Sequence, residues 1–346
     1  MTHEPMTVSV LAPADVPQEA WEAEWSTHAL AVHPRRVREM VRTPSWRHWM
    51  AVACEGGQVI GLMPMSQIVG DRFPVQLFDP RLRAPGLATA AKAEEYLLIG
   101  GHFDLASGCS VLPELSASRA ADVRRALARA GFDHARREGL DGIALYVPDA
   151  ERAAWDDPQA PYTCEQVSEF NAIELAEPGW DGYIAGLKSS RRSVVVRDVR
   201  ALEQQGLRAE LVDPATILAE AAPLIIDVKA NHGQDEHPQL VEYRLERWIG
   251  QGAGVALAFA LRDAHGSLLA AAFGRRCGRV IEMYEIGLCN GIPARTLAYA
   301  EVLIYAPLRH AADTGCTVLR LGCESGHPKQ LRGAAVSPVW AVGLPS

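Results

Sequence analysis

The sequence predicts an α/β protein built from two tandem domains. At 346 residues, the chain is long enough for each half to bury a core of its own. A hairpin followed by a strand, a helix and a strand occurs in both halves, so the second half repeats the element order of the first. A segment rich in Asp and Pro at residues 153–162 separates the halves. We therefore predict domains at residues 1–160 and 161–346.

The first half supplies one copy of this unit. A helical pattern at 14–40, with an interrupted apolar face, precedes two alternating segments at 50–54 and 58–63. These segments flank a Glu-Gly-Gly sequence and predict a hairpin. The pattern continues with a loop region at 71–85, a strand at 96–99, a helix at 118–130 that Gly131 ends, and a strand at 142–147.

The second half begins with a basic helix, which we predict from Trp180 to Gly206. Its inward stripe has residues three or four positions apart, as one face of a helix requires. The stripe consists of Ile184, Leu187, Arg191, Val195, Val199 and Leu202. Gly206 suits the position that follows the last helical turn. The further elements are a helix at 216–228, a hairpin of 255–261 and 268–273, a strand at 279–288, a helix at 294–314 and a strand at 317–321.

Charge distinguishes this helix from the rest of the chain. The protein has 34 basic and 42 acidic residues, a net charge of −8 and a pI of about 5.8. A dedicated DNA-binding protein is usually basic, so we expect no DNA partner. A polyanion must instead bind a local patch, and the basic helix is the best candidate. The alternative is a solvated helix face held by local ion pairs.

Cysteine spacing and hydropathy exclude several classes of protein. No stretch approaches the roughly 18 apolar residues of a membrane helix, and the N-terminus lacks the pattern of a signal peptide. The seven cysteines include no C-x-x-C pair, and their number is odd. Both features argue against a zinc site and a disulfide framework. We expect a cytoplasmic protein with no membrane partner, no metal and no tightly bound cofactor.

The order of features after Trp180 resembles a known family. An aromatic residue, a short turn, Leu-Lys-Ser-Ser-Arg-Arg, a basic helix and a closing Gln-Gly are similar to the entry to the second domain of the Fem-like acyltransferases, which are tandem members of the GNAT superfamily. The resemblance extends to about Trp340. It implies two GNAT-like domains, each a mixed, mostly antiparallel sheet flanked by helices, with the active site mainly in the second.

The reaction that the resemblance implies is transfer of an acyl or aminoacyl group to an amine. Fem enzymes proper also carry a coiled-coil arm, and this chain has no long heptad insertion. It is therefore more similar to the smaller armless relatives that acylate amines in natural-product pathways. The acceptor we expect is a small-molecule amine.

The donor is inferred from a missing motif. Ordinary GNAT domains bind the pyrophosphate of coenzyme A through a Gln/Arg-x-x-Gly-x-Gly/Ala loop. The matching place reads EIGLCNGIPARTLAYA and lacks that spacing, as does LLIGGHFDLASG in the first half. The resemblance then favours aminoacyl-tRNA as donor, with acyl-CoA or an acyl-carrier protein as one alternative and a non-catalytic binding module as another. The expected donor-binding residues are Lys188, Arg191, Arg192 and Arg295.

The segment LRLGCESGHPKQLRG carries the first catalytic candidates. The family shows a glycine, a short loop, a lysine and a further glycine here, and Gly322, Lys329 and Gly333 match that pattern. The resemblance implies that Lys329 lies near the reacting carbonyl, where its charge would stabilise the oxyanion. The alternative is a surface loop lysine. Glu324 and His327 lie in the same loop and are candidates to take a proton from the amine.

The strand RVIEMYEIGL supplies the remaining candidates. Alternation places Glu282, Tyr284 and Ile286 on one face, and Met283 and Glu285 on the other. In GNAT folds this strand lines the acceptor channel, which makes Glu282 the first choice of base and Tyr284 a substrate-binding residue. The alternative for Glu282 is an ion pair with one of three nearby arginines: Arg275, Arg276 or Arg279.

A polar cluster at 231–238, with the sequence NHGQDEHP, lies between two predicted helices. We expect His232 and Asp235 to contact the substrate from this loop. An H-x4-H spacing without further ligands is a weak metal signature, so we predict no metal here. The alternative is a solvated linker.

Overall fold

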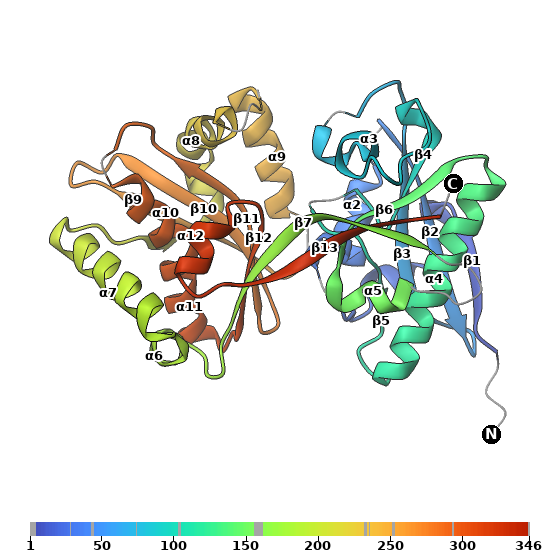
Figure 1. Cartoon of the computed structure of the whole chain (residues 1–346), viewed down its shortest axis with the longest axis horizontal. Helices are drawn as coiled ribbons and strands as arrows, with labels where there is room; N and C mark the ends of the chain where they lie inside the picture. Colours follow the sequence, from blue (N-terminus) through green and yellow to red (C-terminus); the bar gives the residue numbers. More distant parts are fainter. Residues whose placement is uncertain are drawn as a thin grey trace. The chain divides into compact units, whose positions relative to one another are not determined.

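The computed structural model describes residues 5–27, 29–42, 45–73, 75–102, 105–155, 162–231, 234, 236–250, 253–292 and 294–344. The chain forms two compact units (Figure 1). Unit 1 contains Met1–Glu169 and Ser337–Ser346, and unit 2 contains Phe170–Val336. The chain therefore passes between the units within β7 (Thr163–Glu174) and again within β13 (Ala335–Gly343). The domain boundary predicted at residues 160 and 161 lies outside the described residues.

Unit 1 is a mixed sheet flanked by helices. Its strand order is β1-β2-β3-β4-β6-β13, with β5 paired to β3; among the described strand pairs of this unit, only β4 and β6 run parallel. Its strands are β1 (Thr7–Leu11), β2 (Trp46–Glu55), β3 (Gln58–Ile68), β4 (Tyr96–Ile99), β5 (Ser110–Val111), β6 (Asp141–Pro148) and β13. Its α-helices are α1 (Gln18–Glu22), α2 (Pro34–Met40), α3 (Pro80–Arg83), α4 (Ala117–Arg137) and α5 (Asp149–Trp155).

Two helix predictions in unit 1 are wrong. The segment 14–40 is not one helix. Proline cannot continue a helix from the preceding turn, so α2 begins as a new helix at Pro34. The residues before it form three short elements: η1 (Pro13–Asp15), α1 and η2 (Leu30–Val32). Helix α4 does not end at Gly131 but continues through it. A Cβ there would lie 2.8 Å from Ile99 Cγ2, so the glycine permits close packing of the helix on the sheet.

Unit 2 has the same kind of architecture. Its strand order is β7-β12-β11-β10-β9-β8, and β11 with β12 is the one parallel pair among the strands described for this unit. Its strands besides β7 are β8 (Glu210–Val212), β9 (Val255–Arg262), β10 (Leu268–Cys277), β11 (Val280–Leu288) and β12 (Val318–Cys323). Its α-helices are α6 (Trp180–Gly186), α7 (Ser189–Gln204), α8 (Leu218–Ala230), α9 (Pro238–Gly250), α10 (Arg295–Ala300), α11 (Ala306–Thr314) and α12 (Gly326–Leu331).

Helices cover both faces of the unit 2 sheet. Alternate residues of β9 separate the two cores: Ala258 packs in one core with α8 and α9, whereas Phe259 packs in the other with α10 and α11. A π-helical turn, η6 (Glu301–Tyr305), joins α10 to α11 and is buried throughout. The predicted hairpin, strand, helix and strand of this half are confirmed. No helix in the described part of the chain is long and apolar enough to cross a membrane.

The predicted basic helix is broken into α6 and α7. Leu187 has an extended backbone and its side chain is buried, so the helix stops there and restarts at Ser189. The Arg192 guanidinium bridges the break by donating to the carbonyl oxygens of Ile184, Ala185 and Leu187. The end of α7 is as predicted, since Gly206 follows it with a positive φ of 64°.

Candidate active site

Strands β11 and β12 are parallel neighbours over only three residue pairs. The paired residues are Val280 with Val318, Ile281 with Leu319, and Glu282 with Arg320. On its other side β12 pairs with β7 from Val318 to Cys323, and β11 continues to Leu288 along β10. The backbone pairing between the described residues of β11 and β12 thus ends at Glu282, the predicted base.

At that end, Glu282 and Arg320 form an ion pair. Glu282 Oε2 lies 3.2 Å from Arg320 Nη1, and the two side chains are 17% and 19% exposed. This partner is the residue directly opposite on β12, and the predicted alternative did not include it. Arg275 is instead buried and donates to backbone carbonyls, including that of Ala253.

A β-bulge follows at Tyr284. Phe273 of β10 is opposite Glu285 and Gly274 is opposite Met283, so Tyr284 is the extra residue of β11. Because the bulge shifts the alternation by one residue, Tyr284 and Glu285 both contact Arg244 in α9. The predicted faces of Glu285 and Ile286, which follow the bulge, are therefore wrong. Glu285 lies on the face of Glu282 and Tyr284, and Ile286 packs with Met283 in the opposite core.

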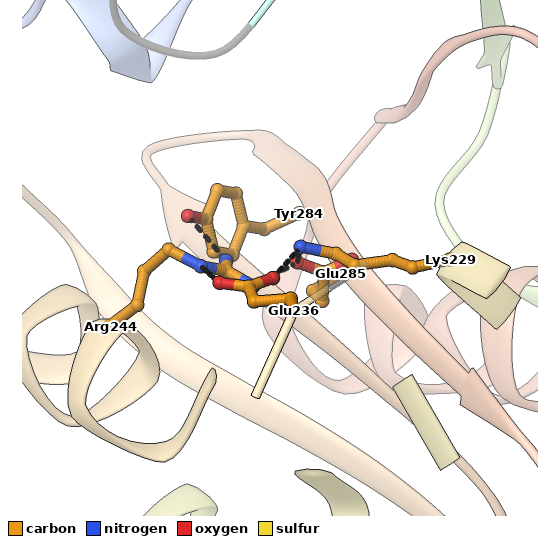
Figure 2. Close-up of polar contacts among 5 residues, drawn as sticks. All are labelled: Lys229, Glu236, Arg244, Tyr284 and Glu285. Carbon is orange, nitrogen blue, oxygen red and sulfur yellow. Dashed lines mark hydrogen bonds and ion pairs between the residues drawn. The ribbon is translucent and has the colours of Figure 1, made fainter. Parts of the chain in front are cut away.

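Five side chains meet on this face of β11, and Figure 2 shows their contacts. Arg244 Nη1 donates to Tyr284 Oη over 3.0 Å, and Arg244 Nη2 lies 2.8 Å from Glu285 Oε2. Glu236, in the connection between α8 and α9, pairs with both Arg244 and Lys229. Lys229 Nζ is also 3.7 Å from Glu285 Oε2. Sequence reasoning missed this cluster, because its members come from separate elements.

The surroundings favour the charged forms of Arg244 and Glu236. Burial lowers the pKa of Arg244, but the neighbouring Tyr284, Glu285 and Glu236 outweigh that effect and raise the pKa above its ordinary value. For Glu236, burial acts to raise the pKa, but the hydrogen bond from Lys229 and the charge of Arg244 lower it overall. The Tyr284 ring is fixed by stacking on Trp248, with centroids 4.7 Å apart and planes within 6°.

Lys329 is buried, so the alternative of a surface lysine is wrong. Its side chain is 4% exposed, and its Nζ donates to the carbonyl oxygens of Leu321 at 2.8 Å, Glu324 at 2.9 Å and Cys323 at 3.1 Å. Burial lowers the pKa of this amine to about 8, although Cys323 and Glu324 act in the opposite direction. The ammonium therefore organises the turn between β12 and α12.

That turn has an uncommon backbone. Gly322, Glu324 and Ser325 have φ angles of 74°, 61° and 46°, and the latter two are not glycines. Left-handed conformations at such residues cost free energy and are often found at functional sites. The contacts of Lys329 with the carbonyls of the turn offset part of that cost. The side chains of Glu324 and His327 are exposed, and neither is hydrogen-bonded to Lys329 or Glu282 within the described residues.

The predicted donor-binding cations differ in their surroundings. Lys188 and Arg191 form no hydrogen bond or ion pair with other described side chains, and the same holds for two further cations of α7, Arg197 and Arg200, which were not among the predicted residues. Local ion pairs therefore do not hold these four side chains. Arg192 is instead engaged with the end of α6. Arg295 opens α10, and its Nη1 donates to Asn290 Oδ1 over 2.8 Å. The substrate-binding candidates His232 and Asp235 lie outside the described residues.

Comparisons with known proteins establish the fold. No protein-family model and no curated protein matches the sequence. The structure is similar to FemX, at 11% identity and a TM-score of 0.62, over 98% of this chain and 97% of that chain. It is also similar to L-PGS from Bacillus licheniformis, at 12% identity and a TM-score of 0.59, over 96% and 93% of the two chains.

A third similar structure is a tandem GNAT protein from the clavulanic acid biosynthesis pathway, at 13% identity and a TM-score of 0.50, over 99% of this chain and all of that one. The tandem GNAT fold is thereby confirmed for this chain. Within the described residues, no three His, Cys, Asp or Glu side chains are grouped as ligands for a metal ion.

Proposed function

We propose that unit 2 is an N-acyltransferase, which moves an aminoacyl or acyl group to the amine of a small-molecule acceptor in natural-product biosynthesis. The observation that carries the proposal is the end of the β11–β12 pairing at the Glu282–Arg320 ion pair. There two parallel strands of a GNAT fold separate, and an acidic side chain lies at the point of separation. Ligands of α/β sheets commonly bind where neighbouring strands part.

The proposed chemistry needs a base at that point. An amine that attacks an ester or thioester carbonyl loses a proton as the new C–N bond forms, and Glu282 would accept it directly or through a water molecule. Arg320 orients the Glu282 carboxylate by pairing with one of its oxygens. Tyr284 would contact the acceptor on the same face of β11.

Lys329 would act at the adjacent turn. An ammonium has three N–H donors, and those of Lys329 are directed at the carbonyl oxygens of that turn. In the proposal Lys329 holds the turn, and it stabilises the oxyanion when one donor moves from a carbonyl to the reacting oxygen. Glu324 and His327, exposed on the same turn, are the alternative proton acceptors.

The proposed donor is aminoacyl-tRNA, and its support comes from α7. Four exposed or half-exposed cations on or next to this helix have no partner within the described residues: Lys188, Arg191, Arg197 and Arg200. In a chain of net charge −8, these cations form a local site for a polyanion. The resemblance of residues 180–206 to the entry of the second domain of Fem-like acyltransferases favours the same donor class.

Donor binding and product formation test the proposal separately. The purified protein is mixed with labelled aminoacyl-tRNAs, acyl-CoAs and acyl-carrier proteins, and binding of each is measured by filter retention. The bound donor is then incubated with a panel of amines, and amide products are sought by mass spectrometry. We expect aminoacyl-tRNA to bind, and Glu282→Gln to keep donor binding but lose amide formation. If only acyl-CoA bound, acyl-CoA would replace aminoacyl-tRNA as the proposed donor. If no donor bound, the result would favour a non-catalytic binding module.

A further inference from the structure

The charges of the cluster in Figure 2 balance only because Glu236 is part of it. Lys229 and Arg244 carry two positive charges, and Glu285 carries one negative charge, which leaves +1 for these three side chains. The Glu236 carboxylate neutralises that charge by pairing with both cations. Partial burial strengthens such pairing, because water screens it less than at the open surface. The two cations therefore form a site for one monoanion.

Arg244 does not depend on Glu236 for its position. Its Nη2 lies 2.8 Å from Glu285, and its Nη1 donates to Tyr284 over 3.0 Å. The contacts with Glu236 are longer, at 3.3 Å from Nε and 3.4 Å from Nη2. Glu285 and Tyr284 belong to strand β11, whereas Glu236 precedes α9 by two residues. Arg244 is thus held by β11 without Glu236, whereas Lys229 has Glu236 as its close partner and lies 3.7 Å from Glu285 Oε2.

We propose that Lys229 and Arg244 bind the carboxylate of the acceptor, and that Glu236 occupies this carboxylate site in the free protein. The ligand class is a compound with both an amine and a carboxylate, since the present occupant is itself a carboxylate. The inference rests on the proposed function only in assigning the ligand as acceptor.

The position of the site on β11 agrees with this assignment. Glu285 follows the proposed base Glu282 by three residues, which is roughly 10 Å along an extended strand. Ile281 and Met283 pack in the opposite core, so Glu282 points to the same face of the sheet as the cluster. A carboxylate bound by Lys229 and Arg244 would leave a flexible amine able to extend toward Glu282.

The test removes Glu236 and measures the binding of small probes without any donor. Ligand-observed NMR titrations compare γ-aminobutyrate, n-butylamine and inorganic phosphate on the parent protein and Glu236→Gln. If Glu236 occupies the site about nine-tenths of the time, its removal tightens carboxylate binding about tenfold. We expect that gain for γ-aminobutyrate but not for n-butylamine, and we expect the double variant Glu236→Gln/Arg244→Gln to lose it.

Glu220→Gln is the matched control. Glu220 lies on α8 and, like Glu236, pairs with an arginine, Arg262, but at an exposed position away from the cluster. The Glu220→Gln variant should bind each of the three probes with the affinity of the parent protein. Circular dichroism verifies the fold of each variant, and Glu236→Ala replaces Glu236→Gln should the latter not fold.

Three results would overturn the carboxylate site: equal γ-aminobutyrate affinity in the parent and the Glu236 variants, an equal gain for n-butylamine, or tighter binding of phosphate than of the carboxylate. None of these results depends on catalysis. Donor binding and amide formation without tighter γ-aminobutyrate binding in Glu236→Gln would contradict the carboxylate site but not the proposed function. Tighter γ-aminobutyrate binding in Glu236→Gln, with no donor bound by the protein, would support the carboxylate site and contradict the proposed acyltransferase activity.

Discussion

Asp198 in α7 and Arg332 after α12 form a buried ion pair, with Asp198 Oδ2 2.7 Å from Arg332 Nη2 and side chains 6% and 4% exposed. Tyr305 Oη donates to the same carboxylate over 2.8 Å. Arg332 Nη1 also donates to the carbonyl oxygen of Pro328, one residue before Lys329. The pair therefore fixes the proposed donor helix to the proposed catalytic turn.

Asp198→Asn should destabilise the protein strongly. The change leaves the Arg332 charge buried without a counter-charge, and breaking a buried pair from one side typically costs about 3–5 kcal/mol. Urea unfolding followed by circular dichroism measures the loss. Glu220→Gln, which breaks an exposed pair with Arg262, should cost less than about 1 kcal/mol. Equal stability of Asp198→Asn and the parent would show that the pair contributes nothing to the fold.

Lys329→Ala should reduce turnover while leaving donor binding nearly intact. A cation near the carbonyl oxygen acts mainly in the transition state, and one such contact is typically worth roughly 10²–10³ in kcat. Lys329→Arg should rescue little, because the planar guanidinium places its charge elsewhere. Single-turnover kinetics with saturating donor measure the effect. Unchanged turnover would remove Lys329 from catalysis and leave Glu282 as the residue to examine.

Acid should destabilise unit 1 in a defined pH range. Burial lowers the pKa of His33 and of His48 to about 4, from an ordinary value of 6.5. The unfolded chain therefore binds protons between pH 6.5 and 4 that the folded protein does not, and the free energy of unfolding falls as the pH falls through that range. Each shift corresponds to about 3 kcal/mol at most.

Denaturant titrations between pH 7 and pH 4 measure this loss. His48 Nδ1 is within 2.9 Å of Ser66 Oγ, so His48→Gln keeps a polar partner for Ser66 and removes the titrating ring. The pH dependence should be shallower in His48→Gln than in the parent. If its slope were unchanged, His48 would not be the group responsible.

Local sequence patterns predicted the elements of unit 2 well, and long-range pairing poorly. The strand at 279–288 and the helix at 294–314 follow from periodicity, because each forms from neighbouring residues. The return of Ser337–Ser346 to unit 1 has no local signal, since the pairing of β13 with β6 joins residues far apart in the chain. Gly131 shows the same limit: its role depends on Ile99, which only the folded sheet brings close.

Only part of the candidate site was predicted, because the rest depends on a β-bulge and on side chains from distant elements. Glu282 was chosen because the resemblance to GNAT folds places this strand along the acceptor channel. The bulge at Tyr284 reverses the faces of the following residues, and period-two reasoning cannot detect it. Glu285 was therefore assigned to the wrong face, and its partners Lys229 and Arg244 were missed because two helices supply them.

The free cations of α7 give a prediction about the donor. Arg191→Ala/Arg197→Ala/Arg200→Ala should weaken aminoacyl-tRNA binding, because fewer counterions would be released from the polyanion. The slope of log affinity against log salt should fall by about one for each cation that contacts a phosphate. Binding measured by filter retention over a range of KCl concentrations gives both quantities, and thermal stability should change little.

Arg192→Ala separates this effect from a structural one. Because the Arg192 guanidinium donates to the carbonyl oxygens of Ile184, Ala185 and Leu187, its removal should lower the melting temperature. The salt slope of donor binding should then change less than in the triple variant, since Arg192 is already engaged. If the triple variant bound aminoacyl-tRNA with the affinity and slope of the parent, the donor would not lie on α7. The charged face of the basic helix would then be a solvated surface, as in the alternative given in the sequence analysis.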